Sequence, residues 1–270
     1  MRHSLALILL LTLTACGIFS PDIKKEPSPA TQAKELFDEA KEQMMGGYYE
    51  QAIKNFETLQ SRFPYGRYAQ QAQLEIAYAY YKQQEPESAI AAADRFIKLY
   101  PNHKHVDYAY YLKGLANFNE NMGLLGGIVK QDLSERDPYA AREAFATFKE
   151  LVTRFPDSRY TPDARLRLQY LVNALARYEV HVAQYYLRRG AHIAAANRAK
   201  DILRDYPQTL ASMDALRIMV SAYDAMGMNE LRDDTQRVLD KNLANAEAAK
   251  QKVTGLTEAQ GKKSWWQFWK

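Results

Sequence analysis

The sequence has few of the residues that build disulfides, metal clusters and turns. Cys16 is the only cysteine among 270 residues, which excludes a disulfide within the chain and any cysteine-based zinc cluster. Glycine and proline number 12 and 10, below the average usage of about 12% for the two together. Turns are therefore scarce, which argues against a many-stranded barrel and against low-complexity disorder. The composition favours helices.

The chain also lacks a strong excess of either charge. Lys and Arg total 36, against 32 Asp and Glu. The whole excess lies in residues 241–270, which carry six Lys and two Glu, so the rest of the chain is balanced. A neutral body offers no phosphate-neutralising face, which argues against nucleic acid as the main partner.

No apolar run near the N-terminus is long enough to span a bilayer. Residues 5–13, LALILLLTL, follow Arg2 and His3 and fit the apolar core of a secretory signal peptide. A buried core helix is the weaker alternative, because the run leads into a polar linker that contains proline and cannot pack. We therefore predict that residues 1–15 are a signal peptide that is removed.

Leu13, Thr14 and Ala15 precede Cys16 in a pattern that resembles the lipobox of bacterial lipoproteins. This resemblance implies an N-acyl diacylglycerol anchor at Cys16 and no other cofactor, and residues 16–30 would form a lipidated linker. Several acyl chains anchor a protein durably where one would not. In bacterial lipoproteins, an Asp directly after the lipidated cysteine usually signals retention at the inner membrane. Because Gly17 occupies this position, the resemblance implies that the protein is anchored at the periplasmic face of an outer membrane. An inert buried thiol is the weaker alternative for Cys16.

Four aromatic-proline pairs mark a repeat. They are Phe63-Pro64, Tyr100-Pro101, Phe155-Pro156 and Tyr206-Pro207. Apolar residues recur twelve, eight and five positions before each proline: Ala52, Phe56 and Leu59; Ala89, Ala93 and Phe96; Ala144, Phe148 and Leu151; Ala195, Ala199 and Ile202. This spacing places them on one face of a helix that ends at the proline.

The same spacing is typical of the second helix of a tetratricopeptide repeat. The third unit carries extra residues at 119–137, the fourth has a lengthened first helix at 162–188, and a fifth unit without a closing proline fits a capping repeat. We predict an all-α solenoid of five helix pairs over residues 31–245, with N-terminal repeats at 31–118 and C-terminal repeats at 138–245. Residues 246–270 form a basic, Trp-rich tail, for which a membrane-interface role and a functionless end are about equally favoured.

The first helices of such a stack line a concave groove. The repeat register directs Lys34, Met44 and Leu74 toward it, together with the residues we predict to bind peptide: Phe37, Lys41, Tyr78, Tyr81 and Lys82. For any single tyrosine, packing between repeats is the more common role.

Motifs for catalysis and metal binding are missing. The sequence contains no G-x-S-x-G, Walker or H-E-x-x-H motif. His103 and His105 form a pair after a proline, and His181 and His192 lie in another unit without metal-ligand spacing. We therefore predict no catalytic site, no metal site and no enzymatic activity.

Several segments go beyond generic repeat spacing. They are RFPYGRYAQQAQLEIAYAYYK (62–82), RFIKLYP (95–101), RDPYAAREAF (136–145), SRYTPDA (158–164) and YEVHVAQYYLRRGAHIAAANR (178–198). With the lipobox, they resemble the BamD family, lipoprotein subunits of the β-barrel assembly machinery, over most of residues 16–240. The tail after residue 245 departs from that family's pattern.

The resemblance implies a non-catalytic scaffold for folding and inserting outer-membrane β-barrels. The N-terminal repeats would receive the C-terminal signal strand of an unfolded barrel, and the C-terminal repeats would hold the periplasmic domains of BamA. BamC and BamE would be further partners. Arg198 occupies the position that meets an acidic residue of BamA in that family; a local ion pair with Asp201 or Asp205 is the alternative. A second function class stays open, an envelope adaptor related to peptidoglycan or stress that uses the same groove.

Overall fold

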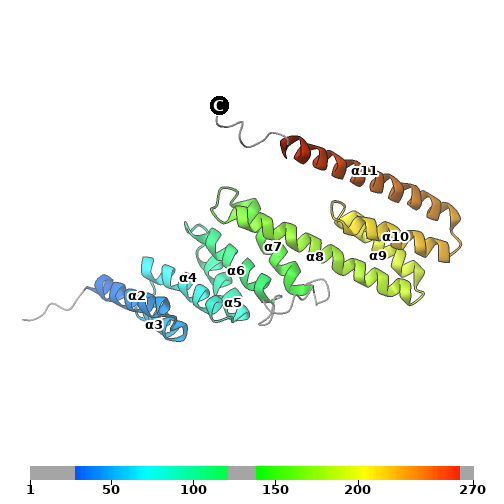
Figure 1. Ribbon diagram of the computed structural model, residues 1–270. Coiled ribbons are helices and arrows are strands. Elements are labelled where there is room, and N and C mark those ends of the chain that lie inside the picture. Colours follow the sequence, from blue (N-terminus) through cyan, green and yellow to red (C-terminus); the bar gives the residue numbers. More distant parts are fainter. Residues whose placement is uncertain (1–27, 121–137, 262–270) are drawn as a thin grey trace, which may run out of the picture. The chain divides into compact units, whose positions relative to one another are not determined.

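The computed structural model describes residues 28–120 and 138–261, and every regular element in these ranges is an α-helix (Figure 1). The helices are α2 (Pro29–Met45), α3 (Tyr49–Arg62), α4 (Arg67–Lys82), α5 (Pro86–Leu99), α6 (Val106–Glu120), α7 (Tyr139–Arg154), α8 (Thr161–Arg188), α9 (His192–Asp205), α10 (Ala211–Ala225) and α11 (Asn229–Gly261). They form five consecutive pairs, so the predicted all-α repeat architecture is confirmed.

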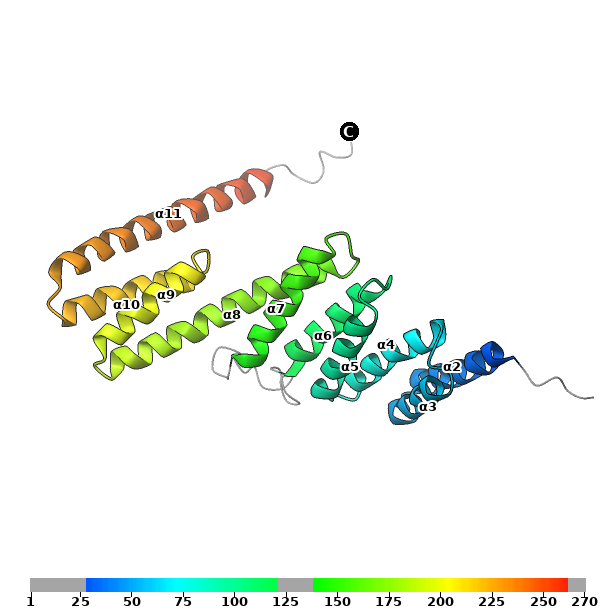
Figure 2. The ribbon, with the colours of Figure 1, turned by 180° about the vertical axis from the view of Figure 1, so that it is seen from behind.

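The chain divides into two compact units, residues 1–72 and 73–270, with the boundary inside α4. In the first unit, α2 packs against α3, and the Gln60 side chain of α3 donates a hydrogen bond to the Ala69 carbonyl of α4. In the second unit, helices from α5 to α11 pack successively along the chain, and α10 also contacts α8 (Figure 2). Each helix thus buries one face against its sequence neighbours, as in tetratricopeptide stacks.

The predicted core positions are all fully buried. The twelve residues counted back from the four prolines have exposed fractions of 0% in every case. Alanines at the first of these positions let the paired helices approach closely, and Phe56, Phe96 and Phe148 fill the space further along. The spacing of apolar residues therefore identified the core of each repeat correctly.

The aromatic-proline pairs end the second helices, as predicted. Phe63, Tyr100, Phe155 and Tyr206 are the C-cap residues of α3, α5, α7 and α9, with φ near −131° and ψ between 46° and 64°. A residue before proline avoids the helical region because it would clash with the proline ring. Within two helix pairs the turns contain Gly47 and Gly190 with φ of 82° and 73°, a conformation that glycine adopts without steric cost.

The lengthened first helix of the fourth unit is confirmed as α8, which has 28 residues. Its N-terminal half supplies Ala164, Leu171 and Leu175 to a core shared with α6 and α7. Its C-terminal half supplies Ala176, Val180 and Ala183 to a core shared with α9 and α10. The extra length thus joins two apolar clusters of the second unit.

The last helix, α11, continues past residue 245, where the repeat pattern was expected to end, and reaches Gly261. Residues 246–261 are rich in Ala, Glu, Gln and Lys, which favour helix without a repeat-specific apolar face. The predicted signal peptide, Cys16, most of the 119–137 segment and the tryptophans of the tail lie outside the described residues.

Candidate functional site

Two of the five predicted peptide-binding residues lie on α2 in the first unit. The half-buried ring of Phe37 contacts the rings of Phe56 and Tyr68, with centroid distances of 5.5 Å in both cases. Lys41 lies one turn further along α2 and is also half-buried. Phe37 therefore contributes to packing between the helices of this unit, and its role in peptide binding stays a prediction.

The first unit also contains a cavity of about 540 Å³ between the start of α2 and the segment joining α3 to α4. Phe63, Tyr65 and Tyr68 line it together with Lys34 and Arg67. The Tyr65 side chain is 93% exposed, and the Arg67 guanidinium lies 4.7 Å from the Tyr68 ring centroid. Exposed aromatic rings beside cations suit an aromatic, anionic ligand. Of these residues, the sequence analysis had placed only Lys34 toward the groove; it did not identify the others as part of a site.

The other predicted peptide-binding residues, Tyr78, Tyr81 and Lys82, lie at the end of α4 in the second unit. The two tyrosines are half-buried and Lys82 is exposed. Burial, above all, raises the pKa of Tyr108 on α6, and the nearby Tyr160, Glu75, Tyr78 and Tyr81 raise it further. Tyr78 and Tyr81 therefore lie close enough to Tyr108 for their charges to affect its phenol. The five predicted residues thus fall in two units, Phe37 and Lys41 in the first and the other three in the second.

A row of tyrosines continues from α4 across the next first helices. The Tyr160 ring lies 5.2 Å from the Tyr108 ring and 4.8 Å from the Tyr111 ring, stacking on the latter with an interplanar angle of 19°. The sequence analysis missed Tyr108, Tyr111 and Tyr160. Tyr108 and Tyr111 repeat the three-residue spacing of Tyr78 and Tyr81 on a first helix, so this spacing was the available signal.

Charged groups fix one end of this tyrosine row. Tyr111 Oη donates to Asp163 Oδ2 at 2.8 Å, and Arg167 Nε donates to the same oxygen at 2.6 Å. Burial raises the pKa of Asp163, but the hydrogen bonds from Arg167 and Tyr111 outweigh it and hold this pKa below its ordinary value. The row therefore ends at an ionised carboxylate.

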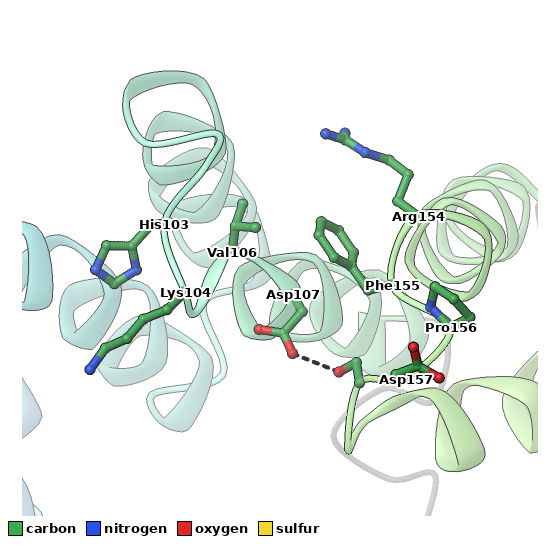
Figure 3. Close-up of a pocket in the computed structure, with 9 residues that line it drawn as sticks. His103, Lys104, Val106, Asp107, Arg154, Phe155, Pro156 and Asp157 are labelled. Atoms are coloured by element: carbon green, nitrogen blue, oxygen red, sulfur yellow. Dashed lines mark hydrogen bonds between the residues drawn. The ribbon is translucent and has the colours of Figure 1, made fainter.

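A second cavity of the molecule lies beside the start of α6 (Figure 3). It has a volume of 380 Å³, and Val106, Phe155 and Pro156 form its apolar part. Ser158 Oγ donates to Asp107 Oδ2 at 2.6 Å, which ties the loop after α7 to the first turn of α6. Asp107 also accepts from the Tyr108 backbone N–H at 2.8 Å, and its negative charge in the first turn of α6 interacts favourably with the helix dipole.

Arg198 lies on α9 in the second unit, and its ion-pair partner differs from the local alternative considered above. Its Nη1 is 3.0 Å from Glu179 Oε2 on α8, whereas Asp201 and Asp205 pair with Arg204. The other oxygen of Glu179 lies 3.1 Å from Arg142 Nη2 on α7. The sequence could not reveal this contact, because it depends on the register between three different helices.

Neither membrane-spanning helices nor metal sites were found in the described part of the chain. No helix there is both long and apolar enough to cross a bilayer. Within the same ranges, no group of His, Cys, Asp and Glu side chains is arranged to hold a metal ion.

Comparisons with known proteins point to one group of relatives. Residues 29–239 match the model of the YfiO family, described as outer membrane lipoprotein. Outer membrane protein assembly factor BamD of Neisseria meningitidis serogroup B is 42% identical over 260 residues, which cover 96% of each chain. The protein of the same name from Vibrio cholerae serotype O1 is 35% identical over 236 residues, 87% of this chain and 96% of that one.

Among solved structures, the crystal structure of MamA protein is similar at 17% sequence identity, over 81% of this chain and 94% of that chain. Its TM-score of 0.34 is too low to bear on the site.

Proposed function

Because this chain belongs to the YfiO family of outer membrane lipoproteins, which covers residues 29–239, we propose that it is a non-catalytic scaffold in the assembly of outer-membrane β-barrels. The observation that carries this proposal is 42% identity to a named assembly factor over 96% of the chain. An envelope adaptor of another kind is less favoured, since the curated relatives described above share the assembly-factor name.

The proposal includes an acyl anchor on Cys16, which would hold the helical stack at the periplasmic face of the outer membrane. Covalent lipidation with several chains gives stable anchoring without a membrane-spanning helix. The N-acyl diacylglycerol group would be the only non-protein component, and the stack itself would lie in the periplasm.

The scaffold would bind the C-terminal signal strand of an unfolded barrel through its first helices. In the second unit, the aromatic side chains of such a strand would pack on Tyr78 and Tyr81, and the terminal carboxylate would accept a charge-assisted hydrogen bond from Lys82. In the first unit, Phe37 and Lys41 would offer the same pairing of an aromatic ring with a cation. The half-buried phenols of Tyr78 and Tyr81 support this assignment, because they offer aromatic faces beside an exposed cation.

The C-terminal repeats would hold the periplasmic domains of BamA, with Arg198 facing an acidic residue of that partner. The Arg198 side chain is 44% exposed, which leaves part of its guanidinium accessible. BamC and BamE would be further partners in the same complex.

Two experiments test this function. Purification of the intact complex from detergent-solubilised envelope should recover this chain in stoichiometric amounts with an outer-membrane barrel that carries periplasmic domains. Recovery without such a barrel would favour the adaptor function instead.

The second experiment measures binding of a peptide that ends in an aromatic residue and a free carboxylate. We expect Lys82→Gln or Lys41→Gln to weaken this binding by about 1.5–3 kcal/mol, the usual contribution of a hydrogen bond to a charged group. Lys98→Gln, on the second helix α5, is the matched control and should bind like wild type. Equal binding by all three variants would refute the carboxylate contact.

A further inference from the structure

Glu179 is a buried carboxylate that two arginines share. Its side chain is 11% exposed, whereas those of Arg142 and Arg198 are 55% and 44% exposed. Each arginine uses one terminal nitrogen on a different oxygen of Glu179. The carboxylate thus forms the base of the cluster, and both arginine side chains remain about half exposed.

The charges in this cluster do not cancel. Two guanidinium groups and one carboxylate leave one positive charge, and within the described residues neither arginine pairs with a second carboxylate. The opposite arrangement occurs further along α9, where Arg204 pairs with both Asp201 and Asp205. A surplus positive charge at a half-exposed site attracts an anion. The charge of Arg204, by contrast, is already balanced by its two carboxylate partners.

Three helices hold the cluster in place. Arg142 comes from α7, Glu179 from α8 and Arg198 from α9, and these helices pack successively on one another. Nearby, burial raises the pKa of the Tyr206 phenol at the end of α9; the charge of Glu179 raises this pKa further and that of Arg142 lowers it. The guanidinium groups are therefore oriented before any partner arrives, which reduces the entropy lost on binding.

We propose that Arg142 and Arg198, bridged by Glu179, form a single docking site for a carboxylate of a protein partner. A carboxylate placed between the two guanidinium groups accepts hydrogen bonds from both. Arginine suits this arrangement better than lysine, because its planar group holds several N–H donors in a fixed geometry. This inference rests on the proposed function, which assigns only Arg198 to BamA. It adds Arg142 as a second contact residue and gives Glu179 the role of a positioning residue.

Binding of the purified periplasmic domains of BamA to the full-length, lipidated chain in detergent tests the site. We expect Arg142→Gln and Arg198→Gln each to weaken the affinity by about tenfold or more, as for truncation of a charge pair that loses water on binding. Arg204→Gln is the matched control on α9 and should remain within about twofold of wild type, since exposed local ion pairs contribute little.

A second measurement needs no substitution and so is independent of any folding defect. An arginine-selective dicarbonyl reagent, with mass-spectrometric readout, should modify Arg142 and Arg198 in the free chain and spare both in the complex. Arg204 should react equally in both states.

The outcomes separate this inference from the proposed function. Loss of affinity in Arg198→Gln alone, with Arg142 still reactive in the complex, would overturn the shared site and leave the assignment of Arg198 intact. Wild-type affinity in both variants would refute both assignments. Absence of binding by the wild-type chain would refute the proposed BamA contact itself.

Discussion

Gly114 offers a sharp test of how closely the first and second helices of a repeat pack. This residue lies inside α6, and a Cβ atom built on it would lie 2.5 Å from Cε1 and 2.8 Å from Cδ1 of Phe148 on α7. Carbon atoms in favourable contact are about 3.5–4.0 Å apart. The substitution Gly114→Ala therefore requires the ring or one helix to move by about 1 Å.

The ring has little room to move. Phe148 is 0% exposed, and the rings of Tyr111 and Phe118 lie 6.2 Å and 6.5 Å from it. Overpacking of a close-packed core costs about 1–3 kcal/mol, and the higher helix propensity of alanine offsets about 1 kcal/mol of this. The difference spans about 0–2 kcal/mol. Because the ring is fully enclosed, we expect the upper half of this range, a net loss of about 1–2 kcal/mol in the free energy of unfolding.

Urea unfolding monitored by circular dichroism measures this loss. The variant Gly114→Ala/Phe148→Leu provides the control, because the smaller side chain makes room for the methyl group. Its stability should exceed the value expected from adding the two single substitutions. Equal or greater stability of Gly114→Ala relative to wild type would show that the two helices are not in this close contact.

Two further predictions concern the anchor and the pH dependence. Cys16→Ser should leave a folded chain that no longer fractionates with the outer membrane in cells lacking the barrel-assembly partners, since the acyl chains provide membrane affinity; unchanged membrane fractionation would contradict the anchor. Asp163→Asn should cost most stability at neutral pH and progressively less below about pH 4, because a carboxyl group with a lowered pKa stabilises the fold only when ionised. Urea midpoints at several pH values test this, and a difference that does not change with pH would exclude an electrostatic contribution from Asp163.

The repeat spacing predicted the core of each unit because a single physical rule produces it. Small or bulky apolar residues at fixed distances before a proline must share a helix face, and the proline ends that helix. Ala195, Ala199 and Ile202 illustrate the rule, since all three are completely buried. These positions depend only on neighbours within one helix, which a sequence displays directly.

Contacts between helices were predicted less well. The alternative considered for Arg198 was a local ion pair with Asp201 or Asp205, yet Arg198 pairs with Glu179 on the preceding helix. This pair joins two helices across the turn at Gly190, so it depends on how α8 and α9 pack on each other and not on the periodicity of either helix. The stacking of Tyr160 on Tyr111 likewise joins residues 49 positions apart, and helical periodicity cannot identify such pairs.

The division between core and surface residues explains how one stack can carry several binding sites. Alanine, leucine and phenylalanine make up most of the interior of the repeats, and partly buried tyrosines pack against it. Tyr111 donates its hydroxyl to the partly exposed Asp163, and Glu179 pairs with two arginines that are about half exposed. Substitutions on these exposed faces can therefore change what each repeat binds, because the alanine-lined contacts that hold the helices together remain as they are.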